Sequence, residues 1–197
     1  MPVTPYTIDM AENNYFNNQF LVAMPGLVDP NFNHSVTLLC EHNEQGALGL
    51  VINRPTELRL ADMLEHMKLA HPALDEGTHI VHWGGPVQTE RGFVIHSEPG
   101  KWESSLRIAD ELFITTSKDV LSAIGQGSGP KHFLVTLGYA GWAAGQLENE
   151  IKENSWLNTP VDRAILFDLP VATRWEAATR LLGVDVTQLT SGPAGHA

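Results

Sequence analysis

The chain has 197 residues, of which 43% are hydrophobic and 18% are charged. This composition excludes wholesale disorder, and a chain of this length buries roughly 70% of its unfolded surface on folding. The formal net charge is −11, because only 12 basic residues are scattered among 23 acidic ones. Proteins that bind DNA or RNA through phosphates need clustered Lys and Arg, so the charge argues against direct nucleic-acid binding and against anionic membranes.

The cysteine count and the N-terminus indicate a compartment. Cys40 is the single cysteine of the chain, which forbids an intramolecular disulfide and fits a reducing environment. No apolar run approaches the roughly 20 residues of a membrane span, and the N-terminus has no signal-peptide pattern. We therefore expect a cytoplasmic protein with no membrane segment. The polar, Asn-rich residues 1–18 predict a loosely ordered N-terminal arm, and residues 19–197 predict a single domain.

A strand pair organises the first half of the chain. Residues 20–24 predict a short strand that ends at Pro25. Apolar, β-branched runs at 36–40 and 47–52 flank a polar break at 42–46, which predicts a hairpin with a loop of four or five residues. Both runs are nearly continuous in apolar residues, so we expect both faces of the hairpin to be covered by other elements.

The remaining elements do not alternate regularly. Further strands are expected at 79–83, 92–96, 112–116, 132–137 and 164–167. Helices are expected over 60–69, after the Thr116-x-x-Asp119 spacing, over 146–154 and over 171–182. Because this order is not a βαβ alternation, it predicts an α+β fold with a bent, mixed or largely antiparallel sheet and helices outside it.

Short motifs in one order span nearly the whole chain from Phe20. They are Phe20–Pro25, Ser35-Val36, Cys40-Glu41-His42, Gly46–Gly49, Asn53 with Pro55, Gly84-Gly85-Pro86, Arg91-Gly92-Phe93, Thr115-Thr116-Ser117, Asp119-Val120-Leu121, Leu137–Ala140 with Trp142, Gly145–Glu148 with Glu150, Asn154 with Trp156-Leu157, and Arg174-Trp175. Together they resemble the YqgE/AlgH family of bacterial proteins, apart from Gly141, where related chains often carry a serine. The resemblance implies an α+β fold whose bent sheet forms a pseudo-barrel, and the AlgH name implies a regulatory role in alginate production. Direct transcription-factor activity is disfavoured, because no helix-turn-helix with a basic recognition helix is visible.

One group of residues suggests thiol chemistry. Cys40 and His42 are two residues apart on a predicted strand, so their side chains are expected to share a face. A Cys40 thiolate activated by His42, with Arg91 beside a pocket, would give a small-molecule-binding protein or a thiol-dependent enzyme. The alternative is a buried Cys40 that packs as a small apolar residue.

A second group suggests a recognition surface. Aromatic and polar side chains gather over a short stretch that comprises Tyr139, Trp142, Gln146, Glu148, Glu150, Asn154 and Trp156. Exposed aromatic residues beside a polar helix stripe are typical of a protein interface, whereas buried tryptophans would leave the carboxylates only solvating the helix.

The favoured hypothesis is a non-enzymatic binding or regulatory protein whose protein partner docks there and at the Gly84-Gly85-Pro86 turn. No cofactor is expected, and no metal site is expected because His79 and His82 point to opposite faces of their strand and no CxxC is present. The sequence leaves the oligomeric state open.

Overall fold

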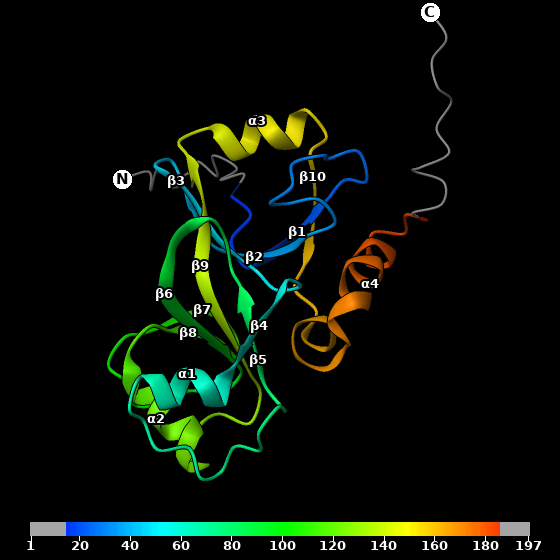
Figure 1. The fold of residues 1–197 in the computed structure, drawn as a ribbon. Coiled ribbons are helices and arrows are strands. Elements are labelled where there is room, and N and C mark those ends of the chain that lie inside the picture. The colour runs from blue at the N-terminus through cyan, green and yellow to red at the C-terminus, as the bar shows by residue number, and fades with distance from the viewer. Residues whose placement is uncertain (1–14, 186–197) are drawn as a thin grey trace, which may run out of the picture.

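The computed structural model describes residues 15–185, which form one ten-stranded sheet and a few short helices (Figure 1). The strands are β1 (Gln19–Ala23), β2 (Val36–Asn43), β3 (Gly46–Val51), β4 (Pro55–Arg59), β5 (Ile80–Trp83), β6 (Val87–His96), β7 (Ser105–Ala109), β8 (Leu112–Thr115), β9 (Phe133–Ala143) and β10 (Trp156–Pro160). The helices are α1 (Leu60–His66), α2 (Lys118–Gln126), α3 (Gln146–Lys152) and α4 (Arg174–Leu181), and α4 follows a π-helical turn (Ala164–Asp168) and a 3₁₀ turn (Val171–Thr173).

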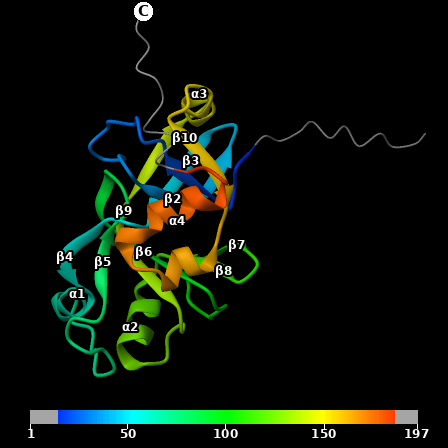
Figure 2. The ribbon, with the colours of Figure 1, turned by 90° about the vertical axis from the view of Figure 1, so that its right-hand side faces the viewer.

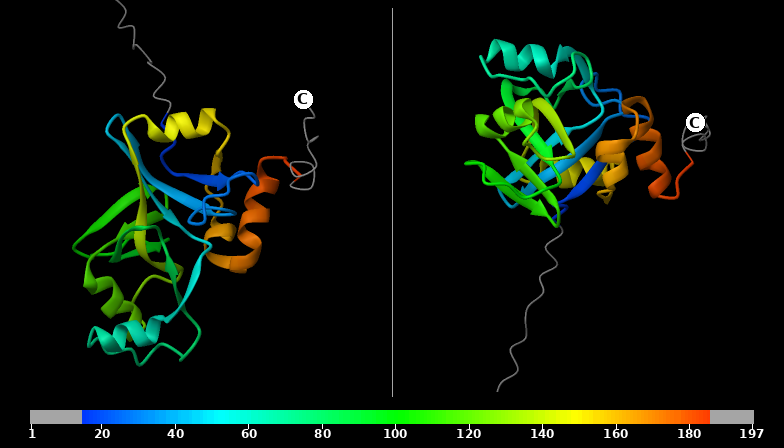
Figure 3. Two further views of the ribbon diagram at one scale, coloured as in Figure 1. Left: turned by 45° about the horizontal axis from the view of Figure 1, so that its top comes forward. Right: turned by 90° about the horizontal axis from the view of Figure 1, so that it is seen from below.

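Strand β9 joins the two halves of the sheet. The strand order is β10-β1-β2-β3-β9-β6-β8-β7, and β5 lies beside β9 with β4 as its outer neighbour. The end of β9 pairs with β3, and its beginning pairs with β6. Every strand pair is antiparallel except β5 with β9. Figure 3 shows the sheet curling around this long strand, so the predicted α+β fold with a bent, largely antiparallel sheet and flanking helices is confirmed.

Side chains that alternate along the strands supply separate cores on the two faces of the sheet. On β6, Phe93 and Ile95 join the core that contains the π-helical turn and α4, whereas Val94 joins the core beneath α1 and α2. On β2, Leu38 faces the α4 side and Leu39 packs with Leu147 of α3. Both faces of the central hairpin are therefore covered, as the continuous apolar runs predicted, and Figure 2 shows α4 lying across the strands.

Several local predictions need correction. The hairpin turns over two residues, Glu44 and Gln45, because β2 continues to Asn43 and β3 begins at Gly46. The strand expected at 164–167 is a π-helical turn, in which Asp162 Oδ1 accepts the backbone N–H of Ile165 at 3.1 Å. Within residues 15–185 the last strand is instead β10, an edge strand that pairs only with β1.

The helix expected over 146–154 ends at Lys152. Strands β4 and β7 were not predicted from the sequence. Residues 1–14 of the expected N-terminal arm lie outside the described residues. Its end is held in place, because the Asn17 side chain accepts the N–H of His42 and donates to the carbonyl of the same residue. Within residues 15–185, no helix is long and apolar enough to cross a membrane.

Candidate functional site

Cys40 points into the core and away from His42. The β2–β3 register pairs Leu39 with Gly49 and Glu41 with Leu48, so Cys40 sits in a β-bulge. A bulge adds one residue to a strand and reverses the alternation that the sequence argument assumed. Cys40 packs with Leu38 on the α4 side, whereas the His42 ring reaches α3. The expectation that the two side chains share a face is wrong.

The thiol of Cys40 is not prepared for nucleophilic attack. The side chain is only 9% exposed, and its S–H donates to the carbonyl of Leu38 at 3.4 Å. Burial, reinforced by the nearby Glu41 carboxylate, raises the pKa of Cys40 far above its usual value. Since the thiolate is the nucleophile, a thiol that stays protonated at neutral pH does not supply one.

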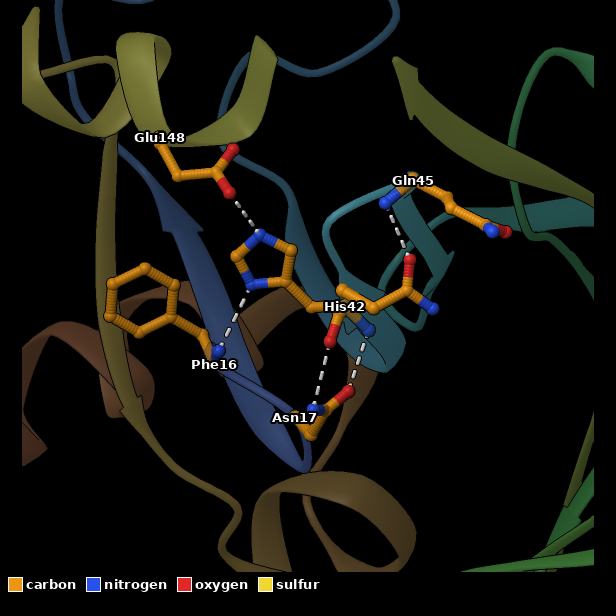
Figure 4. A network of polar contacts seen from close by, with 6 residues as sticks. Phe16, Asn17, His42, Gln45 and Glu148 are labelled. Carbon is orange, nitrogen blue, oxygen red and sulfur yellow. Dashed lines mark hydrogen bonds and ion pairs between the residues drawn. The ribbon is translucent and has the colours of Figure 1, made fainter. Parts of the chain in front are cut away.

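His42 is a buried connector between the chain start, β2 and α3. Its Nε2–H donates to Glu148 Oε1 at 2.9 Å, and its Nδ1 accepts the backbone N–H of Phe16 at 3.0 Å (Figure 4). The Phe16 ring stacks on the imidazole, with ring centroids 5.6 Å apart. Because Nδ1 accepts a hydrogen bond, the ring is the neutral Nε2–H tautomer with both nitrogens occupied. The backbone N–H of Glu148 itself and the His42 ring hold the pKa of Glu148 below its usual value, against an opposing effect of desolvation.

Arg91 does not join the other two candidates. It is exposed on β6, and its guanidinium lies over the ring of Phe93, 5.3 Å from the ring centroid. Cys40 lies in the core and His42 binds Glu148, so the three side chains form no shared site.

The aromatic residues of the predicted recognition surface are mostly buried. Trp142 is 7% exposed and Trp156 is 3% exposed, and both indole N–H groups donate to Glu150 Oε2, at 2.9 and 2.8 Å. The other carboxylate oxygen of Glu150 accepts Gln146 Nε2 at 2.9 Å. The structure therefore shows the second of the two alternatives for this stretch, in which the tryptophans are buried. In addition, one carboxylate accepts hydrogen bonds from both indoles.

The remaining members of that surface are separated. Tyr139 is half-buried and packs edge-on against Phe93, with ring centroids 6.0 Å apart. Asn154 lies beyond the end of α3 with a positive φ of 58°, so it ends the helix and does not extend its stripe.

The Gly84-Gly85 turn is a buried junction. Gly84 donates its N–H to the Leu137 carbonyl at 2.7 Å and accepts the N–H of Val51 at 2.9 Å. A Cβ at Gly85, which has a φ of +156°, would lie 2.0 Å from the Tyr139 carbonyl carbon. Glycine is required because the turn passes directly over the backbone of β9. Of the predicted turn, Gly84 and Gly85 are therefore buried, and Pro86 is the exposed residue.

An open apolar groove lies instead between α1, α2 and strands β6 and β9. Its volume is about 470 Å³. The apolar lining comprises Met63, Met67, Phe93, Val94, Leu121, Val135 and Leu137, and the polar lining includes Thr89, Glu90, Thr116, Ser117 and Lys118. The helix that the sequence predicted over 60–69 contains Met63 and Met67, but helical periodicity does not show whether a neighbour covers its apolar stripe. Within residues 15–185, no group of three or more His, Cys, Asp or Glu side chains is arranged to hold a metal ion.

Comparisons with known proteins agree on one family. A family model described as AlgH-like matches residues 20–187. A UPF0301 protein of Thioalkalivibrio sulfidiphilus is 57% identical over 188 residues, which cover 95% of this chain and 100% of the relative. A UPF0301 protein of Nitrosococcus oceani is 52% identical over 183 residues, which cover 93% of this chain and 97% of the relative.

Solved structures show the same fold. The solution structure of the AlgH protein from Pseudomonas aeruginosa matches with a TM-score of 0.74 and 50% identity, and the match covers 100% of both chains. A crystal structure of a protein from Corynebacterium diphtheriae matches with a TM-score of 0.70 at 18% identity, covering 89% of this chain and 92% of that one. The second match extends the fold to a much more distant sequence.

Proposed function

This chain belongs to the AlgH-like family, and we propose that it is a cytoplasmic, non-enzymatic binding protein that regulates a protein partner by docking it in the α1–α2 groove. The observation that carries the proposal is the groove itself, which has an apolar floor and a polar rim. Protein interfaces have this anatomy, with a desolvated apolar centre surrounded by polar residues.

The proposed occupant is a short amphipathic helix with apolar anchors and basic flanking residues. Two helices forming the walls of a groove above a sheet give the shape that receives a helix, and Met63 and Met67 provide flexible, polarizable contacts. The net charge of −11 favours a basic partner, because long-range attraction steers oppositely charged proteins together.

The alternative, a thiol-dependent enzyme, has less support. Cys40 is buried and protonated, and His42 and Arg91 are engaged elsewhere. A partner surface over Trp142 and Trp156 is also less well supported, since both indoles are in the core.

Site-specific photo-crosslinking in the living bacterium tests the docking site. A benzoyl-phenylalanine is placed at Lys118, which lines the groove, and as a control at the exposed Arg163, which follows β10. The proposal expects one protein to crosslink from position 118, not from 163, and to be lost when Met67→Glu puts a charge in the groove. Equal crosslinking from both positions, or crosslinking that Met67→Glu leaves unchanged, contradicts it.

A further inference from the structure

A second cavity, of about 310 Å³, lies between strand β5, the beginning of β9 and the segment that leads into α4. Its charged and titratable lining consists of His79, His82, Lys131, His132 and Arg174, with no Asp or Glu among the lining residues. The chain as a whole carries 23 acidic residues against 12 basic ones. The cavity therefore has the opposite electrostatic character to the protein around it.

Arg174 lines this cavity without a counter-charge among the described residues. The residue is 5% exposed, and its Nε and Nη1 donate to the carbonyls of Leu169 and Ile52, at 3.2 and 2.5 Å. None of the ion pairs within residues 15–185 includes Arg174. Buried charges are usually paired, so a guanidinium held only by neutral carbonyls retains the capacity to bind an anion.

His82 is the second unusual group. It is 5% exposed, and neither ring nitrogen has a hydrogen-bond partner in the described part of the chain. Thr136, its register partner across the parallel β5–β9 pair, also has a buried hydroxyl without a partner. Burial, together with the charge of Arg174, lowers the pKa of His82 to about 4, so the ring is neutral at pH 7 and has one N–H to donate. Buried polar groups nearly always have partners, and a ligand bound in the cavity would supply the one that His82 lacks.

We propose that this cavity binds a small organic oxyanion, a phosphate ester or a carboxylate, between Arg174 and His82. Arg174 supplies the buried positive charge and the planar donors that suit an oxyanion. His82 donates its N–H to the same group, and the exposed Lys131 and His132 provide a cationic entrance. Phe133 and Phe167 in the wall contact the organic part of the ligand. The site is separate from the partner groove, with which it shares only Val135 as a lining residue.

Histidine-detected NMR on the full chain at pH 7 tests the proposal. Inorganic phosphate, phenyl phosphate and benzoate are titrated separately at constant ionic strength, with chloride as the reference salt. The ring-nitrogen resonances of His82 are expected to shift and saturate with at least one of the three. Saturation by the phosphates alone assigns the site to phosphate esters, and saturation by benzoate assigns it to carboxylates. His82 resonances that respond to none of the three overturn the proposal.

Calorimetry on variants gives the second readout. His82→Leu replaces the ring with an apolar side chain of similar size and is expected to lower affinity at least tenfold, and Lys131→Gln at the entrance is expected to lower it at least threefold. Lys101→Gln, which removes an exposed lysine that lines neither cavity, is the matched control and should stay within twofold of the wild type. Because Lys131 is exposed, its variant keeps the test valid if His82→Leu fails to fold. Affinities within twofold of the wild type for the folded cavity variants contradict the proposal.

Discussion

His42 and Glu148 meet across the boundary between β2 and α3, with Nε2 and Oε1 2.9 Å apart, 106 positions apart in the chain. The contact fixes α3 to the central hairpin. It also orients the imidazole of His42, whose Nδ1 accepts the backbone N–H of Phe16. Glu148→Ala is expected to lower the free energy of unfolding by about 1 kcal/mol, because a charge-assisted hydrogen bond to a partly exposed carboxylate is lost. Urea denaturation measures the change. Glu153→Ala, an exposed residue just after α3, is the control and should have almost no effect.

Glu150 is the more important carboxylate of this region. Glu150→Ala leaves the indole N–H groups of Trp142 and Trp156 without their acceptor, so the expected loss is about 3 kcal/mol of unfolding free energy. The same denaturation experiment, followed by tryptophan fluorescence, measures it. A loss of unfolding free energy no larger than that of Glu153→Ala would contradict this prediction. It would mean that water replaces the carboxylate and that Glu150 does not stabilise the fold.

Cys40 should react only when the protein unfolds. Its buried, protonated thiol is expected to resist a disulfide reagent at pH 7 and to react stoichiometrically in denaturant. The time course of thiol labelling in native buffer and in urea provides the measurement. Complete labelling of the native protein within minutes would revive the thiol-dependent alternative.

The stability of the fold should depend on His82 below neutral pH. The folded-state pKa of about 4 is below the ordinary value of 6.5, so the unfolded chain binds this proton more readily than the folded one. The contribution of His82 to stability is complete above pH 6.5 and is lost as the pH falls from 6.5 towards 4, at no more than about 1.4 kcal/mol per pH unit.

The groups that face the His82 cavity are Arg174, Lys131, His79 and His132, and the cationic ones oppose protonation of the ring. Denaturation of the wild type and of His82→Leu is measured between pH 4 and 7. Carboxylates titrate in both proteins, so the difference between their pH profiles is the contribution of His82. Parallel pH profiles of the unfolding free energy for the two proteins would show that His82 does not cause the loss of stability.

The sequence predicted the fold well where local patterns and packing agree. The continuous apolar runs of β2 and β3 and the periodicity of α1 correctly identified elements that are buried on the faces those patterns indicate. Ala164–Asp168 was misassigned because a short apolar run suits a buried strand or a buried helical turn equally, and the hydrogen bond from the Ile165 N–H to Asp162 Oδ1 accompanies the helical turn.

The candidate site was harder to predict, because its features depend on tertiary contacts. The β-bulge at Cys40 reverses one alternation and separates it from His42. Trp142 and Trp156 are buried because Glu150 satisfies both indoles, which no spacing rule reveals. Arg174 and His82 are distant in sequence and line one cavity only because the first residue of α4 lies beside β5 and the beginning of β9.

The most direct test of the docking account is the affinity of the crosslinked partner segment, made as a synthetic peptide, for the purified protein. Met67→Glu places a negative charge in the groove, and Leu106→Glu places the same charge on β7, where Leu106 is 57% exposed and does not line the groove. Calorimetry should show an affinity at least tenfold weaker for Met67→Glu and within twofold of the wild type for Leu106→Glu. Equal affinity of the Met67→Glu variant and the wild type would contradict docking in the α1–α2 groove.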